Sequence, residues 1–223
     1  MNKIQLVVCD LAGTTIRDSG QVTDAFTTAL ASHGLTVTPE QLNAIRGSSK
    51  RDAVRAFVPD GPHHVRQVED VYTSFRRNLA DRYRSRGVTA VPGVEDVFRW
   101  LRSHDVRVAL NTGFDSDITE LLLGALHWDL DTVDAVVCGD DVPEGRPAPH
   151  LIFRAMEACA TNDAQQVANV GDTVLDLEAG HRAGVRWNIG VLSGAHGRRR
   201  LASAPHTHLL ASIADLPDLW NRH

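Results

Sequence analysis

Residues 4–15 read Ile-Gln-Leu-Val-Val-Cys-Asp-Leu-Ala-Gly-Thr-Thr, and this stretch decides the fold class. Its apolar residues run almost without alternation up to Asp10, which is typical of a strand buried on both faces of a parallel sheet. Similar runs recur at Val106–Thr112, Ala135–Asp141, Val167–Thr173 and Trp187–Leu192. Helical patterns alternate with these runs, at Val94–Ser103, Asp117–Leu126, Pro149–Ala160 and Leu175–Ala183. The alternation predicts an α/β fold with a doubly wound parallel sheet.

Residues 17–88 break this rhythm, because they contain no strand-like run. Their patterns are helical, at Val22–His33, Pro39–Ile45, Lys50–Phe57 and His64–Arg86. We therefore predict two domains: a catalytic core formed by residues 1–16 and 89–223, and an inserted helical cap formed by residues 17–88.

Composition narrows the class of protein. Of the 223 residues, 43% are apolar and 23% are charged, which is ordinary for a soluble globular chain and excludes disordered, collagen-like and coiled-coil proteins. The apolar runs are too short to cross a bilayer, and no leader pattern opens the chain, so we expect a cytoplasmic protein without a membrane partner. The net charge of −5 argues against nucleic acid as a partner. Whether the chain forms a homodimer stays open.

Two smaller features give further expectations. The three cysteines are odd in number and lack metal-ligand spacing, so we expect reduced, buried thiols. The basic run Arg198–Arg200 is expected to be a solvated loop.

Polar clusters follow the predicted strands where each strand ends. They contain Asp10, then Asn111-Thr112-Gly113, then Gly145-Arg146-Pro147, then Gly171-Asp172-Thr173 with Asp176 one turn later. Ligands of parallel α/β sheets bind beyond the carboxyl ends of the strands, so these clusters should converge. Two carboxylates and a main-chain carbonyl suit Mg²⁺, while a hydroxyl, a guanidinium and loop amides suit phosphoryl oxygens. A carboxylate beside the metal can also act as a nucleophile, so the sequence predicts phosphoryl transfer.

The ordered motifs DxAGTT, Thr after a strand, GRP and GDTxxD, with a helical insertion after the first, resemble the haloacid dehalogenase superfamily. The resemblance covers nearly the whole chain and implies a Rossmann-like core and a small phosphorylated or phosphonate substrate. It implies that Asp10 is the nucleophile, that Thr112 and Arg146 bind the phosphoryl group, and that Asp10, the Ala12 carbonyl and Asp172 hold Mg²⁺ with Thr173 and Asp176 behind them. The expected substrate-binding residues are Thr14, Arg46, Gly47, Gly113 and Phe114.

Within that superfamily the sequence is most similar to the phosphonatase branch, in DDVPxGRP at residues 140–147, VGDTVxD at residues 170–176 and Gly-x-x-Lys at residues 47–50. The resemblance implies cleavage of the P–C bond of phosphonoacetaldehyde, with Lys50 forming a Schiff base to the aldehyde. Chemistry favours a lysine here, because an imine accepts the electrons of the broken bond and only a primary amine can form one. Lysine is scarce in this chain: of its 23 basic residues only Lys3 and Lys50 are lysines.

Some positions depart from these patterns. Ala12 stands where most phosphatases of the superfamily have a second Asp that protonates an alkoxide leaving group, which favours a leaving group that needs no such acid. Where the phosphonatase branch has Met, His and Tyr, this chain has Arg46, Ala53 and Phe114, and the branch's Cys after the first motif is not matched. These changes point to a related phosphonate, with Arg46 meeting an extra anionic or hydroxyl group.

Two alternative functions remain open at the level of sequence. One is a phosphatase for a small phosphate monoester such as phosphoglycolate, in which Lys50 acts only as a charge clamp. The other is a non-catalytic protein that binds a phosphate-bearing ligand, which the complete set of expected core catalytic residues disfavours.

Overall fold

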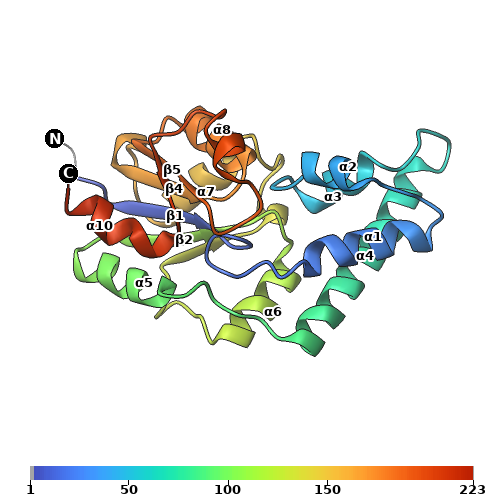
Figure 1. The fold of residues 1–223 in the computed structure, drawn as a ribbon, viewed down its shortest axis with the longest axis horizontal. Helices are drawn as coiled ribbons and strands as arrows, with labels where there is room; N and C mark the ends of the chain where they lie inside the picture. Colours follow the sequence, from blue (N-terminus) through green and yellow to red (C-terminus); the bar gives the residue numbers. More distant parts are fainter. Residues whose placement is uncertain (1–2, 223) are drawn as a thin grey trace.

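A computed structural model describes residues 3–222 and shows a parallel β-sheet flanked by helices (Figure 1). The six strands lie in the order β3-β2-β1-β4-β5-β6, and every neighbouring pair is parallel. The strands are β1 (Leu6–Asp10), β2 (Arg107–Asn111), β3 (Ala135–Val137), β4 (Val167–Gly171), β5 (Trp187–Val191) and β6 (His208–Leu210). The predicted α/β class and doubly wound sheet are confirmed.

The two faces of the sheet carry different helices because successive side chains of a strand point to opposite faces. Leu6 and Val8 of β1 pack with α7 (His150–Ala158) and α8 (Val174–Ala183). Val7 and Cys9 share the larger core with α5 (Val94–Ser103), α6 (Ser116–Leu126) and α10 (Leu216–Trp220). All five residues of β1 are buried, which explains its unbroken apolar sequence.

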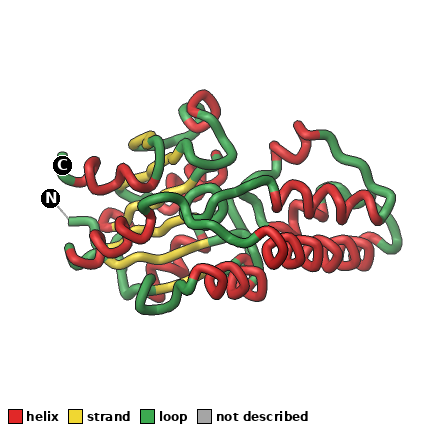
Figure 2. Tube along the Cα trace, turned by 60° about the horizontal axis from the view of Figure 1, so that its bottom comes forward, coloured by secondary structure: helices red, strands yellow, loops and turns green. Residues whose placement is uncertain are grey.

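The helical segment, residues 17–88, lies beyond the carboxyl end of β1 (Figures 1 and 2). It contains α1 (Gln21–Ser32), α2 (Pro39–Ala44), α3 (Lys50–Arg55) and α4 (His64–Arg86). Helices α1 and α4 pack along each other, with the Phe26 and Phe75 ring centroids 5.3 Å apart in an edge-to-face arrangement. The division into a core of residues 1–16 and 89–223 and a cap of residues 17–88 stays a prediction.

The chain enters and leaves the helical segment through two connections that are hydrogen bonded to each other. Ile16 and Ala90 form an antiparallel bridge. On either side of it, the Arg17 N–H donates to the Thr89 carbonyl at 2.9 Å and the Val91 N–H donates to the Thr15 carbonyl at 2.8 Å. The two connections therefore form a short ladder directly after the Asp10 loop.

The structure corrects three expectations. The third strand ends at Val137 rather than at Asp141, and residues Gly139–Asp141 form the 3₁₀ turn η1, because the Asp141 carboxylate caps it by accepting the Cys138 N–H at 2.8 Å. The basic run is not a loop but opens helix α9 (Arg198–Leu201), which the fully buried Leu201 anchors. A sixth strand, β6, follows it and pairs with β5, although its three residues are only half-buried and give no strand-like pattern.

The cysteines and the remaining short elements complete the described fold. Cys9, Cys138 and Cys159 are free and buried, as predicted. Two further 3₁₀ turns, η2 (Ala164–Gln166) and η3 (Ile213–Asp215), precede β4 and α10. Among residues 3–222 there is no helix with the length and apolar character needed to cross a bilayer.

Candidate active site

Strand β1 ends at Asp10 and so places this residue at the centre of the sheet edge. Asp10 is 6% exposed, and the Thr15 hydroxyl donates to its carbonyl at 3.0 Å. Gly13 has φ +97°, and a Cβ there would lie 2.3 Å from the Asp172 carboxylate. Glycine is therefore required at residue 13, both for the left-handed backbone and for the close approach of the loop after β4.

Arg146 holds the carboxylates of this edge together. Its Nη1 lies 2.7 Å from Asp10 Oδ1 and 2.9 Å from Asp176 Oδ1, and its Nη2 donates to Asn111 Oδ1 at 2.6 Å. Burial raises the pKa of Asp10 to about 6, with the Arg146 guanidinium opposing that rise and the Asp176 carboxylate adding to it. Asp10 thus has one oxygen, Oδ1, paired with a buried guanidinium.

The segment after β4 places two further acids, Asp172 in the loop and Asp176 in the first turn of α8. Thr173 caps α8 by accepting the Asp176 N–H, and the Asp176 carboxylate accepts the Thr173 N–H in return, so both side chains are fixed. Asp172 accepts the Ala195 N–H at 2.6 Å. Burial raises the pKa of Asp172 well above its usual range, and the neighbouring Asp10 and Asp176 carboxylates raise it further.

These acids fit a hard divalent cation. Asp10, Asp172 and Asp176 face a single guanidinium, Arg146, so in their ionised forms these carboxylates bring three negative charges against one positive charge. A bound Mg²⁺ would neutralise that excess and accept carboxylate, carbonyl and water ligands. In residues 3–222 no group of three or more His, Cys, Asp or Glu side chains is arranged as a ligand set, so the ion would rely on two carboxylates, a carbonyl and water. Mg²⁺ stays a prediction.

The helical segment contributes Lys50 from the first turn of α3. The main-chain N–H of Lys50 donates to the Gly113 carbonyl at 3.3 Å, and this hydrogen bond joins α3 to the loop after β2. Its Nζ donates to the Ser48 carbonyl at 3.1 Å and lies 5.2 Å from the centroid of the Phe114 ring. Burial lowers the pKa of Lys50, Asp10 opposes that change, and Arg146 adds to it. A lowered pKa increases the fraction of free amine, which is the nucleophilic form.

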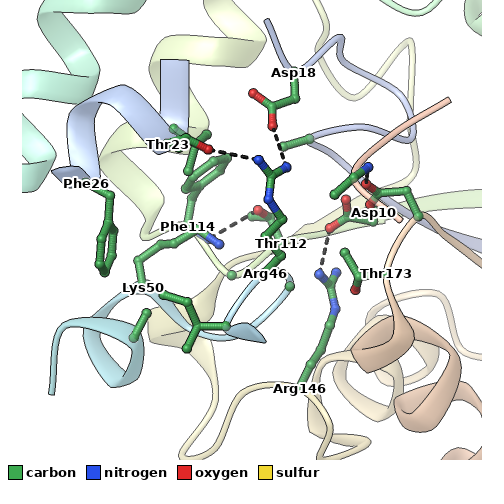
Figure 3. A pocket seen from close by; sticks show the side chains of 18 of the residues that line it. Asp10, Asp18, Thr23, Phe26, Arg46, Lys50, Thr112, Phe114, Arg146 and Thr173 are labelled. Atoms are coloured by element: carbon green, nitrogen blue, oxygen red, sulfur yellow. Dashed lines mark hydrogen bonds and ion pairs between the residues drawn. The ribbon is translucent and has the colours of Figure 1, made fainter. Parts of the chain in front are cut away.

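A pocket lies between the sheet edge and the helical segment (Figure 3). Eleven of the thirteen residues predicted from the sequence to form the site line it: Asp10, Ala12, Arg46, Gly47, Lys50, Thr112, Gly113, Phe114, Arg146, Asp172 and Thr173. The other two lie behind the wall. Thr14 is fully buried with its hydroxyl 3.5 Å from Asp172 Oδ1, and Asp176 is buried against Arg146.

The pocket also contains residues that the sequence motifs did not indicate. Asp18 and Thr23 lie next to Arg46, and Ala195 comes from the loop after β5. The apolar part of the wall comes from the helical segment, from Val22, Phe26, Leu42, Ile45 and Ala53. None of these belongs to a short motif with a chemical signature, and only the folded chain brings them to the Asp10 loop.

Comparisons with known proteins show the family of this chain. Residues 7–189 match the family model described as haloacid dehalogenase-like hydrolase. The chain belongs to this family. As a haloacid dehalogenase-like hydrolase it is an enzyme, and the resemblance seen in its sequence motifs is confirmed.

Relatives within the family share most of the chain. A phosphonoacetaldehyde hydrolase of Parabacteroides distasonis is 29% identical over 88% of this chain and 79% of its own length. A solved structure of a hydrolase from Pseudomonas syringae has a TM-score of 0.87 at 20% identity, covering 98% of both chains. A phosphonoacetaldehyde hydrolase-like protein from Oleispira antarctica has a TM-score of 0.85 at 22% identity, covering 98% of this chain and 92% of that one. The two structures show a shared fold.

Proposed function

We propose that this hydrolase cleaves the P–C bond of phosphonoacetaldehyde or a related phosphonate, through an imine on Lys50 and a phosphoryl group carried on Asp10. One observation carries the proposal: the Lys50 amine lines the same pocket as the Asp10 carboxylate. The two groups come from different parts of the chain, and an aldehyde phosphonate needs both. The name of the Parabacteroides distasonis relative supports this choice of substrate.

In the first half of the reaction, the Lys50 amine adds to the aldehyde and water leaves, which gives the imine. Asp10 then attacks phosphorus, and the electrons of the P–C bond move into the imine to give an enamine. Arg146 and Thr112 stabilise the charge that develops on the transferring phosphoryl oxygens. The enamine takes a proton on carbon, and hydrolysis of the resulting imine releases acetaldehyde and regenerates Lys50.

In the second half, water releases phosphate from Asp10. Mg²⁺, held by Asp10, Asp172 and the Ala12 carbonyl, would neutralise charge between the nucleophile and the phosphoryl group. Ala12 supplies no acid at the place where an ester-cleaving relative of this superfamily would protonate an alkoxide. The P–C route needs none there, because the electrons leave through the imine.

The test is to trap the imine. Enzyme is mixed with phosphonoacetaldehyde and sodium borohydride, and the modified peptide is located by mass spectrometry. We expect a reduced adduct on Lys50 and loss of phosphate release in Lys50→Arg, which keeps the charge but cannot form an imine. The matched control is Lys3→Arg, because Lys3 is the other lysine of the chain. Its amine donates a hydrogen bond to the His104 carbonyl, and neither residue lines the pocket.

The same experiment separates the alternatives. A phosphatase that uses Lys50 only as a clamp would retain much of its phosphoglycolate hydrolysis in Lys50→Arg and give no adduct. A non-catalytic phosphate-binding protein would release no phosphate from either compound. Phosphate release that is abolished in Asp10→Asn would exclude the non-catalytic reading.

A further inference from the structure

A polar cluster in the pocket has no role in the proposed reaction. It consists of Arg46, Asp18 and Thr23, all from the helical segment. The Arg46 Nη1 lies 3.4 Å from Asp18 Oδ2, and its Nη2 donates to the Thr23 hydroxyl at 3.0 Å. Figure 3 shows the Arg46 guanidinium directed toward Asp18 and Thr23, whereas the Arg146 guanidinium is directed toward Asp10.

The cluster is held in place and still has hydrogen bonds to offer. Asp18 is fixed by the Gly20 N–H, which donates to its Oδ1 at 2.9 Å. A guanidinium has five N–H donors, and these two contacts use two of them. Thr23 accepts from Arg46, and its hydroxyl donates to no other group within residues 3–222, so its hydrogen can donate to a ligand. Arg46 and Thr23 therefore present donors to a pocket that they both line.

The Arg46–Asp18 ion pair determines whether the cluster can bind an anionic or an uncharged group of a substrate. Asp18 offsets the charge of Arg46, and its side chain is only 15% exposed. A second carboxylate or phosphate bound here would meet the Asp18 carboxylate as well as the guanidinium. An uncharged oxygen meets no such repulsion and can accept from both Arg46 and Thr23. The cluster thus suits a hydroxyl better than an anion.

The apolar residues of the pocket wall make the cluster a distinct place for a substrate hydroxyl. Val22, Phe26, Leu42 and Ile45 line the same pocket with apolar side chains that offer a substrate no hydrogen bonds. In an aldehyde phosphonate the phosphorus is bound at Asp10 and the aldehyde carbon at Lys50. The aldehyde carbon carries no further carbon substituent, so the carbon between the two ends is the position left for another group.

We infer that the preferred substrate is a phosphonoacetaldehyde that carries a hydroxyl on the carbon between phosphorus and the aldehyde, with Arg46 and Thr23 as the residues that select it. The inference rests on the proposed function. The same bond is broken: Asp10 takes the phosphoryl group and the P–C electrons move into the Lys50 imine. Protonation of the enamine and hydrolysis of the imine then release glycolaldehyde in place of acetaldehyde.

The experiment compares three substrates that differ only in the group on the middle carbon: hydrogen, hydroxyl or methyl. We expect the wild-type kcat/KM for the hydroxyl compound to exceed that for the methyl compound by about tenfold, the value of one hydrogen bond in a partly enclosed site. Arg46→Met and Thr23→Val should each move this ratio toward one. A ratio measured within one preparation does not depend on the fraction of folded enzyme, so a less stable variant still gives an answer.

The matched control is Arg51→Met, because Arg51 belongs to the same segment but pairs with Glu69 outside the pocket lining. It should leave the ratio unchanged. A wild-type ratio near one, or an unchanged ratio in both Arg46→Met and Thr23→Val, would overturn the inference while turnover of the parent compound kept the proposed function intact. If none of the three compounds released phosphate, the proposed function itself would fail.

Discussion

Gly47 provides the most direct test of whether contact between the helical segment and the sheet edge is needed for catalysis. Its φ is +90°, and a Cβ added there would lie 2.3 Å from the Thr173 hydroxyl oxygen and 3.1 Å from Thr173 Cβ. Ordinary contact begins near 3.4 Å, so in Gly47→Ala residue 47 and Thr173 must separate by about 1 Å. The left-handed backbone adds about 1–2 kcal/mol of strain for alanine.

That displacement should impair catalysis more than folding. Residue 47 stands three positions before Lys50, so a shift of the segment moves the amine away from the substrate held at Asp10. A misplacement of about 1 Å can cost on the order of a hundredfold in rate. We therefore expect kcat/KM for phosphate release from phosphonoacetaldehyde to fall by about a hundredfold in Gly47→Ala, with a cooperative thermal transition retained.

Gly61→Ala is the matched control for this experiment. Gly61 lies in the same segment, has no atom within 4 Å of an added Cβ and is outside the left-handed region. Its activity should stay within about twofold of wild type, as is usual for surface changes of less than about 0.5 kcal/mol. Wild-type activity in Gly47→Ala would refute the reasoning, because it would show that the close contact with Thr173 is dispensable.

Four further outcomes are expected. Ala12→Asp should raise hydrolysis of phosphate monoesters relative to phosphonoacetaldehyde by at least about tenfold, since it adds an acid for an alkoxide leaving group; an unchanged ratio would contradict the role given to Ala12. Treatment with EDTA should abolish phosphate release and added Mg²⁺ should restore it, whereas full activity after chelation would exclude the metal. Arg200→Ala removes the 3.2 Å hydrogen bond that Arg200 of α9 donates to the Asn43 carbonyl of α2, and it should lower kcat/KM about fivefold. The control is Arg199→Ala, whose side chain is exposed; equal effects of the two substitutions would contradict this prediction. Leu79→Ala should lower the free energy of unfolding in urea by about 2–5 kcal/mol because Leu79 is fully buried in α4, while Val65→Ala, 76% exposed, should change it little.

The strands that bury both faces could be predicted from the sequence because burial itself dictates their composition. For this reason β1 is apolar up to its last residue, Asp10, and β4 contains a single polar side chain, Asn169. The short edge strand β6 could not be recognised, since its residues are half-buried and the pairing with β5 supplies its order. The third strand was predicted too long because the turn at residues 139–141 is imposed by side-chain caps that periodicity does not reveal.

Some residues of the site could be predicted from the sequence and others could not. Asp10 and Asp172 lie at the carboxyl ends of neighbouring strands, so the sheet topology brings them together, and Arg146 joins them from the segment after β3. Motif order predicted that these residues meet in one pocket; their catalytic roles stay predictions. Asp18 and Thr23 lie on either side of the start of α1, and their place in the pocket depends on how the helices pack over the sheet. That packing is a tertiary property with no local signature. The prediction that Lys50 belongs to the site came from the chemistry of a primary amine and from the family resemblance, not from the spacing of residues.

The hydrogen-bonded ladder between the two connections that enter and leave the helical segment limits how this segment can move. Thr15 accepts a hydrogen bond from Val91 through its carbonyl, while its hydroxyl donates to the Asp10 carbonyl. The two connections are therefore tied to each other, and a displacement of the helical segment relative to the sheet would act on both of them together. Thr15 links these connections to the main chain of Asp10, so such a displacement would change the positions of Lys50 and Asp10 at the same time.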